Sequence, residues 1–182
     1  RRYHALLLAA ATPPSGRFVL VNGLDVTLRT PEGDFPLAFH RYTPGVNNES
    51  KGVRVESFAA DPWPRWTFCL EDGTRVRHEL CVTRGLPRTV LTWRLLQPQR
   101  GARLLVRPLL SGRDYHALHH ENPFFRFDPE IVSSEVRWTP YAGVPATTAR
   151  HNGVYRHEPL WYRGFQYDQE RERGMDFAED LA

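Results

Sequence analysis

The sequence is short of lysine and carries only a small excess of positive charge. Of the 24 basic residues in this 182-residue chain, Lys51 is the single lysine and the other 23 are arginine. With 21 acidic residues the formal net charge is +3, a weak electrostatic basis for binding nucleic acid. The arginine excess has two explanations that stay open: a GC-rich coding bias, or planar guanidinium groups that bind carboxylates, phosphates or sugar hydroxyls.

Long apolar runs are missing as well. The longest is residues 5–11, against about 20 residues for a membrane-spanning helix. Arg1-Arg2 before this run imitates a signal peptide, but an Ala-x-Ala cleavage site at 9–11 would leave an apolar region of only four residues. Met175 is the only methionine, so the chain has no initiator Met. We therefore expect a cytoplasmic protein that does not enter a membrane, and a chain cut from a longer one.

A hairpin is predicted over residues 66–82. Apolar residues alternate on both sides of a Glu-Asp-Gly turn, which is typical of two half-buried antiparallel strands. A three-residue loop with Gly73 in the left-handed conformation places Phe68 opposite Val76, so that the two apolar faces agree.

This register bears on the two cysteines, which are in any case too few for a disulfide framework. Cys69 falls opposite Arg75, and Cys81 lies further along the second strand. The two Cα atoms would be about 20 Å apart, beyond the roughly 7 Å that a disulfide allows. The cysteines are expected to be reduced.

Period-two alternation also marks other segments, and no sustained helical period occurs before Asp168. We predict an all-β sandwich over residues 1–167, with residues 168–182 as the start of a linker or helix. Residues 111–138 lack alternation and are expected to form a long polar loop. Further strands are expected at 18–22 paired with 24–29, and at 35–42, 53–58, 89–96, 103–110, 136–141 and 154–160.

The densest polar cluster lies in that loop, and three interpretations of it remain open. His116, His119, His120 and Glu121 have the residue types of a zinc site, although no cysteine ligand is nearby. Asp114 and Glu121 could instead be the two carboxylates of a glycosidase. The third interpretation is a loop whose polar side chains hydrogen-bond one another.

Two other segments combine aromatic and cationic residues. Arg2, Tyr3 and His4 precede the apolar run, and Trp161 and Arg163 lie near the C-terminus. Aromatic faces stack on sugar rings or bases, and arginine and histidine donate hydrogen bonds to hydroxyls or phosphates. The alternative for each aromatic is a place in the core.

Taken in order, these segments resemble the N-terminal domain of bacterial and archaeal-type glycogen debranching enzymes. Residues 1–7, Arg-Arg-Tyr-His-Ala-Leu-Leu, are similar to that family's Arg-Arg-Tyr-His-Gly-Leu-Leu. Residues 112–123 are similar to its Gly-Arg-Asp-(Tyr/Phe)-His-Ala-Leu-His-x-Glu-Asn-Pro. Trp-Tyr-Arg at 161–163 and Glu-Arg-Glu-Arg-Gly-Met-Asp at 170–176 resemble its closing segment.

The resemblance implies a β-supersandwich of the galactose-mutarotase-like type. It implies that α-1,6 branch hydrolysis belongs to a C-terminal catalytic (α/α)-barrel, so this chain alone is expected to be inactive. The expected partners are that catalytic domain and an α-glucan, such as glycogen or a maltooligosaccharide, with no cofactor and no metal. The residues expected to bind substrate or to face the catalytic domain are Arg2, Tyr3, His4, Arg113, Asp114, His116, Glu121, Trp161 and Arg163.

Two other functions remain as alternatives. One is a freestanding carbohydrate-binding module. The other is a β-domain that binds single-stranded nucleic acid through its arginines and aromatic rings.

Overall fold

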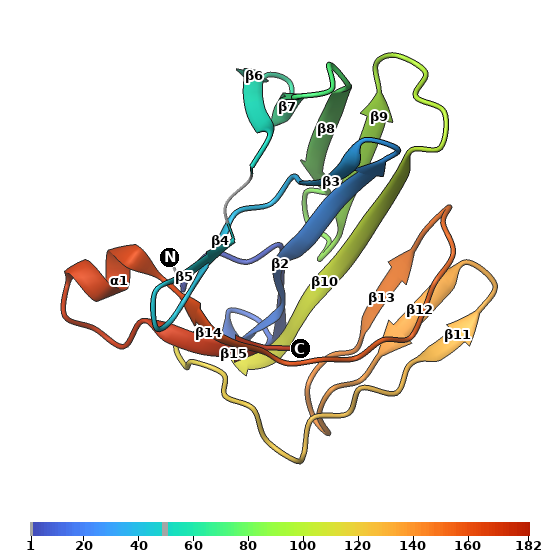
Figure 1. Ribbon diagram of the computed structural model, residues 1–182. Coiled ribbons are helices and arrows are strands. Elements are labelled where there is room, and N and C mark those ends of the chain that lie inside the picture. Colours follow the sequence, from blue (N-terminus) through green and yellow to red (C-terminus); the bar gives the residue numbers. More distant parts are fainter. Residues whose placement is uncertain (1, 49–50) are drawn as a thin grey trace. The chain divides into compact units, whose positions relative to one another are not determined.

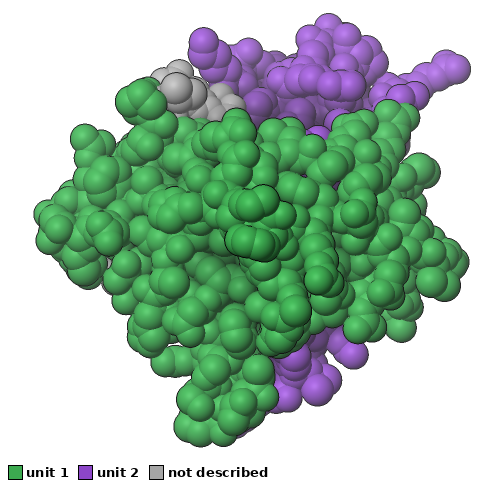
Figure 2. Space-filling view, turned by 90° about the horizontal axis from the view of Figure 1, so that it is seen from below, with its two compact units in different colours: residues 1–23, 41–46, 108–182 green, residues 24–40, 47–107 purple. Residues whose placement is uncertain are grey.

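Strands account for about half of the chain in the computed structural model, which describes residues 2–48 and 51–182 (Figure 1). The predicted fold class, an all-β sandwich, is confirmed. The chain divides into two compact units (Figure 2). Unit 1 comprises residues 1–23, 41–46 and 108–182, and unit 2 comprises residues 24–40 and 47–107.

Unit 1 is built from antiparallel strands. The first half of β2 (Ser15–Thr30) pairs with β1 (Leu7–Thr12), and β2 also neighbours β10 (Arg103–Asp114). A second sheet has the order β15-β14-β4-β5 and a third the order β11-β12-β13. Their strands are β4 (His40–Tyr42), β5 (Val46–Asn48), β11 (Glu130–Val132), β12 (Glu135–Trp138), β13 (Thr147–Arg150), β14 (Tyr162–Gln166) and β15 (Ala178–Leu181).

The apolar core of unit 1 joins strands to the loop that follows β10. Val21 of β2 and Leu110 of β10 pack with Val136 and Trp138 of β12 and with Phe125. Phe125 comes from the long loop, so the loop is fastened to the core by an aromatic side chain. This matters for the site, because four of the predicted residues, Arg113, Asp114, His116 and Glu121, lie just before Phe125 in the chain.

Unit 2 contains a four-stranded antiparallel sheet with the order β6-β7-β8-β9. Its strands are β6 (Val53–Ala59), β7 (Arg65–Leu70), β8 (Arg75–Val82) and β9 (Thr89–Leu95). The second half of β2 pairs with β3 (Gly33–Pro36). Leu28 and Phe35 from this pair form a core with Leu70 and Val76.

The predicted hairpin is confirmed in its register. Phe68 pairs with Val76, Cys69 pairs with Arg75, and Gly73 has φ of 82°. The left-handed conformation explains why glycine stands there, since other residues are strained at that φ. Cys69 and Cys81 are both free thiols.

A row of four aromatic rings crosses this sheet, one from each strand. Phe58, Trp66, His78 and Trp93 are successive cross-strand partners, and neighbouring ring centroids lie 5.1, 5.4 and 4.6 Å apart. The His78 ring is nearly parallel to both indoles. Cross-strand ring pairs of this kind stabilise a sheet beyond the area they bury.

The expected pairing of residues 18–22 with 24–29 is wrong, because both segments belong to the single strand β2. Asn22-Gly23 is a strong hairpin signal, but Gly23 does not adopt the left-handed conformation that such a turn requires. The two halves of β2 pair with β1 and β3 instead, which satisfies their backbone groups.

The expected loop over 111–138 is too long at both ends, because β10 continues to Asp114, β11 begins at Glu130 and β12 begins at Glu135. Residues 154–160 form no strand, and the strand in this part of the chain is β13 instead. The helix expected near the C-terminus is present as α1 (Asp168–Glu172). A strand, β15, follows it and pairs with β14. Within the described ranges no helix has the length and apolarity needed to span a lipid bilayer.

Candidate functional site

The three segments singled out in the sequence come together in unit 1. A guanidinium nitrogen of Arg113 donates to the carbonyl of Arg2 at 2.5 Å. The rings of Tyr3 and His116 lie edge to face, 5.8 Å apart. The fold therefore joins the N-terminal segment to the loop after β10.

Arg113 is the buried centre of this arrangement. Its side chain is 2% exposed, and its Nε lies 2.8 Å from a carboxylate oxygen of Glu179, which is itself fully buried. Another guanidinium nitrogen donates to the carbonyls of residues 114, 115 and 117 at 3.0–3.3 Å. A side chain that binds one carboxylate and several carbonyls fixes the path of the loop, and it is not available to a ligand.

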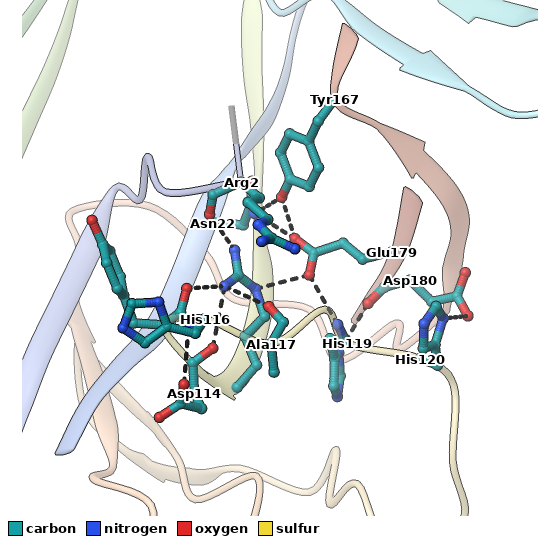
Figure 3. Close-up of polar contacts among 12 residues, drawn as sticks. Arg2, Asn22, Asp114, His116, Ala117, His119, His120, Tyr167, Glu179 and Asp180 are labelled. Atoms are coloured by element: carbon teal, nitrogen blue, oxygen red, sulfur yellow. Dashed lines mark hydrogen bonds and ion pairs between the residues drawn. The ribbon is translucent and has the colours of Figure 1, made fainter. Parts of the chain in front are cut away.

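Glu179 of β15 gathers the remaining partners (Figure 3). One oxygen accepts from the backbone N–H of His119 at 3.0 Å and pairs with Arg113. The other accepts from the amide of Asn22 at 2.9 Å and from the hydroxyl of Tyr167. Burial, followed by the nearby Glu179 charge, raises the pKa of Tyr167, so its hydroxyl stays protonated and donates.

His119 is also held by polar groups on both sides of its ring. Its Nδ1 lies 2.9 Å from the carbonyl of Asp180 and its Nε2 lies 2.7 Å from the hydroxyl of Tyr141. The carbonyl only accepts, so Nδ1 carries the proton and Nε2 accepts from Tyr141. Burial lowers the pKa of His119, which keeps the ring neutral. Burial likewise raises the pKa of Tyr141.

These contacts bear on the three interpretations of the loop: a zinc site, a pair of glycosidase carboxylates, or side chains that hydrogen-bond one another. Both ring nitrogens of His119 are engaged within the protein, so this histidine has no lone pair free for a metal. Among residues 2–48 and 51–182 no group of three or more His, Cys, Asp or Glu side chains is arranged to hold a metal ion. Hydrogen bonds within the loop, the third interpretation, are what the structure shows.

Glu121 and Arg163 form an ion pair at the surface of unit 1. Arg163 donates to both carboxylate oxygens, to Oε1 at 3.0 Å, and the contact raises the pKa of its guanidinium. The carboxylate of Asp180 holds the backbone on both sides of this pair, because it accepts hydrogen bonds from the N–H groups of Glu121 and Gly164 at 3.0 and 2.8 Å. Strand β15 thus positions both the loop and the segment that carries Arg163.

Aromatic rings lie close to the same part of the chain. Trp161 is half-buried, with its ring against His119, Phe125 and Phe127. Phe124 is 76% exposed, and its backbone N–H donates to the side-chain oxygen of Asn122 at 3.1 Å.

The other predicted residues fall elsewhere in unit 1. Arg2 and His116 line a separate open hollow, and Tyr3 packs against His116 and Tyr115. His4 and Asp114 are exposed, and an Asp114 carboxylate oxygen accepts from the backbone N–H of His116 at 2.8 Å.

Four residues that hold the site together were not among those predicted. Asn22 is in a turn-like dipeptide, Tyr167 follows β14, and Glu179 and Asp180 belong to a charged C-terminal segment. Each has an unremarkable local pattern, so no signal in the chain distinguishes these side chains from surface ones.

Comparison with known proteins supports the resemblance noted in the sequence. No curated protein and no solved structure matches the chain. The family model described as "Glycogen debranching enzyme N terminal" matches residues 1–182, the whole chain. The protein therefore belongs to the glycogen debranching enzyme N-terminal family.

Proposed function

We propose that this chain is a non-catalytic domain of a glycogen-debranching glycoside hydrolase that packs on the catalytic domain and helps to position an α-glucan. Hydrolysis of the α-1,6 branch would belong to the catalytic domain of the same polypeptide. The proposal rests on family membership over the whole chain and on the surface formed by Glu121, Trp161 and Arg163. A cytoplasmic location is part of the proposal and is supported by two free thiols.

The observation that carries the glucan contact is the Glu121–Arg163 pair, whose members lie within three residues of Phe124 and Trp161 in the chain. The pair is exposed, and it offers guanidinium donors and carboxylate acceptors in a fixed geometry. Sugar hydroxyls both donate and accept, so they match such a pair. The apolar faces of a glucose unit match exposed or half-buried rings such as Phe124 and Trp161.

The same contacts support a non-catalytic role. Both oxygens of Glu121 are engaged by Arg163, and an oxygen of Asp114 accepts from a backbone N–H. A glycosidase acid must present a proton to the leaving oxygen, and its partner must reach the anomeric carbon or a water. Carboxylates committed to such partners are not poised for either task.

Co-sedimentation with glycogen tests the proposal. The chain is expected to sediment with glycogen, and Arg163→Gln and Phe124→Ala are each expected to weaken binding by about tenfold, as for loss of a ring contact or a charge-assisted hydrogen bond. Arg150→Gln is the matched control, because Arg150 forms an exposed ion pair with Glu135 in the same unit. An equal loss in the control, or no sedimentation at any concentration, would contradict the proposed contact.

Salt dependence separates glucan from the nucleic-acid alternative. Binding through neutral hydroxyls is expected to change little with ionic strength, whereas phosphate-backbone binding falls steeply. The chain alone is expected to release no glucose from a branched glucan. Turnover that disappears in Glu121→Gln would show that the domain is itself an enzyme.

A further inference from the structure

Unit 1 contains an open hollow of about 750 Å³ that the proposed glucan contact does not use. Arg2 contributes to it from the N-terminal segment, His116 and His120 from the loop after β10, and Arg171 from α1. The chain just after α1 completes the lining with Asp176 and Phe177. The volume suits a small organic ligand, since such pockets commonly enclose about 300–1,000 Å³.

The two arginines of this hollow have no carboxylate partner within ion-pair distance among the described residues. The guanidinium of Arg171 lies over the ring of Phe177, 5.6 Å from its centroid. Arg2 lies over the ring of Tyr3 at 5.0 Å and donates to its hydroxyl at 3.0 Å. Arginines 41, 113, 137, 150 and 163 of the same unit are within 4.0 Å of a carboxylate. Arg2 and Arg171 share the lack of such a partner among the described residues with Arg17, Arg126 and Arg173, and they differ from these three in lining the hollow.

Arg2 also has an unsatisfied donor. Its Nε is shielded from solvent and has no hydrogen-bond partner among the described residues. Buried donors in native proteins almost always find a partner, because an unmet one costs about 1–3 kcal/mol. Because this Nε is shielded from solvent, an acceptor in the hollow reaches it only when the Arg2 side chain shifts on binding.

The charges of the lining favour an anion. Arg2 and Arg171 oppose the single carboxylate of Asp176, which leaves one net positive charge before any imidazole is protonated. His116 and His120 add ring N–H groups, and His120 Nδ1 lies 3.8 Å from the nearest Asp180 carboxylate oxygen, beyond hydrogen-bond distance. Guanidinium groups bind phosphate oxygens through paired, charge-assisted hydrogen bonds.

We infer that this hollow binds a phosphate monoester, with the phosphate held between Arg2 and Arg171 and the histidines at its edge. The volume exceeds what a phosphate alone fills, and the Phe177 ring offers an apolar surface for the rest of the ligand. The hollow shares no residue with the proposed glucan contact, since Glu121, Trp161 and Arg163 are not among its lining.

Isothermal titration of the chain at low ionic strength tests this site. The probes are inorganic phosphate, glucose 6-phosphate and, as the neutral control, glucose. Both phosphates are expected to bind, glucose 6-phosphate at least as tightly as inorganic phosphate, and both more weakly as salt is added. Equal binding of glucose and glucose 6-phosphate, or no binding of either phosphate, would overturn the assignment.

Variants locate the binding within the hollow. Arg171→Gln and Arg2→Gln are each expected to weaken phosphate binding about tenfold or more, the factor that corresponds to one charge-assisted contact. Arg173→Gln removes the same charge two residues from Arg171 and outside the hollow, so its affinity is expected to stay within about twofold of the parent. Arg2→Gln retains the carbonyl that Arg113 contacts and serves if Arg171→Gln does not fold. A loss in Arg173→Gln as large as in the other two would refute a defined site.

Discussion

The two units of the molecule bury different kinds of side chain. The buried ionisable groups in the described part of unit 1 are Arg113, His119, Tyr167, Glu170 and Glu179. In the described part of unit 2 the buried polar residues are threonines, at positions 30, 67 and 74, and its core is aliphatic and aromatic. Unit 1 thus combines an apolar core with buried ionisable groups, whereas the described part of unit 2 depends on apolar packing.

This difference changes how each unit responds to substitution. A buried ion pair contributes modest net stability, because both charges lose their hydration, yet removal of one partner leaves the other charge unmatched. Removal of a methyl group or a ring from an apolar core lowers the free energy of unfolding, because the burial of those atoms is lost and a cavity is left behind. The polar centre of unit 1 also fixes the loop and β15, on which the proposed glucan contact depends.

The largest effect is expected from Glu179→Gln. The side chain keeps its size, but Arg113 loses its buried counter-charge, and Tyr167 and Asn22 lose a charged acceptor. We expect the free energy of unfolding to fall by about 3–5 kcal/mol. Urea denaturation followed by circular dichroism measures it, with Glu135→Gln of the exposed Arg150 pair as the control. A similarly small loss of unfolding free energy in Glu179→Gln and Glu135→Gln would show that the buried charges of unit 1 do not set it apart from unit 2.

Leu70→Ala is the counterpart in unit 2. Leu70 is 3% exposed and packs with Leu28, Phe35 and Val76. The cavity is expected to lower the free energy of unfolding by about 2–4 kcal/mol. Because no ionisable group is involved, the loss should be the same at pH 6 and pH 8. A loss that depends strongly on pH would mean that unit 2 is not held by apolar packing alone.

The contrast also explains what the sequence predicts well. The 66–82 hairpin follows from alternating apolar residues and a glycine at the turn, and its register was found correctly. These signals are local, because each residue's side of the sheet is set by its neighbours in the chain. The apolar packing of this sheet in unit 2 is therefore visible in the sequence as alternating apolar residues.

Buried ion pairs between residues far apart in the chain produce no such pattern in the sequence. Arg113 looks like a loop residue and Glu179 like part of a solvated tail, since only the folded chain shows that they meet. The segments that carry the site were found from their residue types, and the ion pair between Glu121 and Arg163 lies within that set. Asn22 is expected at the end of the strand over 18–22, and its hydrogen bond to Glu179 has no local sign in the sequence.

Acidification is expected to affect both units through one histidine each. Burial is the main cause that lowers the pKa of both His119 in unit 1 and His78 in unit 2. Unfolded histidine takes up a proton near pH 6.5 while these folded rings resist it, so stability is present above that pH and is lost as the pH falls below it. His119→Asn, which keeps a donor near the Asp180 carbonyl, and His78→Gln should each flatten this loss.

Thermal unfolding between pH 5 and pH 8 measures the two contributions. His78 is stacked between Trp66 and Trp93, and His119 lies against Trp161, so indole fluorescence reports on the surroundings of both histidines and the two variants separate them. If the fall of the thermal midpoint with decreasing pH disappears in His119→Asn alone, the pH response belongs to unit 1. The same fall of the thermal midpoint with pH in both variants as in the parent would contradict the expected role of these two histidines.

The smallest effect is expected from Arg163→Gln, which compares two arginine–glutamate pairs within unit 1. Arg163 is 68% exposed in its side chain, whereas Arg113 is 2% exposed. Water replaces a lost partner at the surface but not in the core, so the thermal midpoint of Arg163→Gln should match that of the parent. Asp180 holds Glu121 and Gly164 through backbone N–H groups, and these contacts survive the substitution. A clear drop in the midpoint would show that the surface pair belongs to the buried charge network, and a loss of glucan binding in this variant would then report on folding rather than on contact.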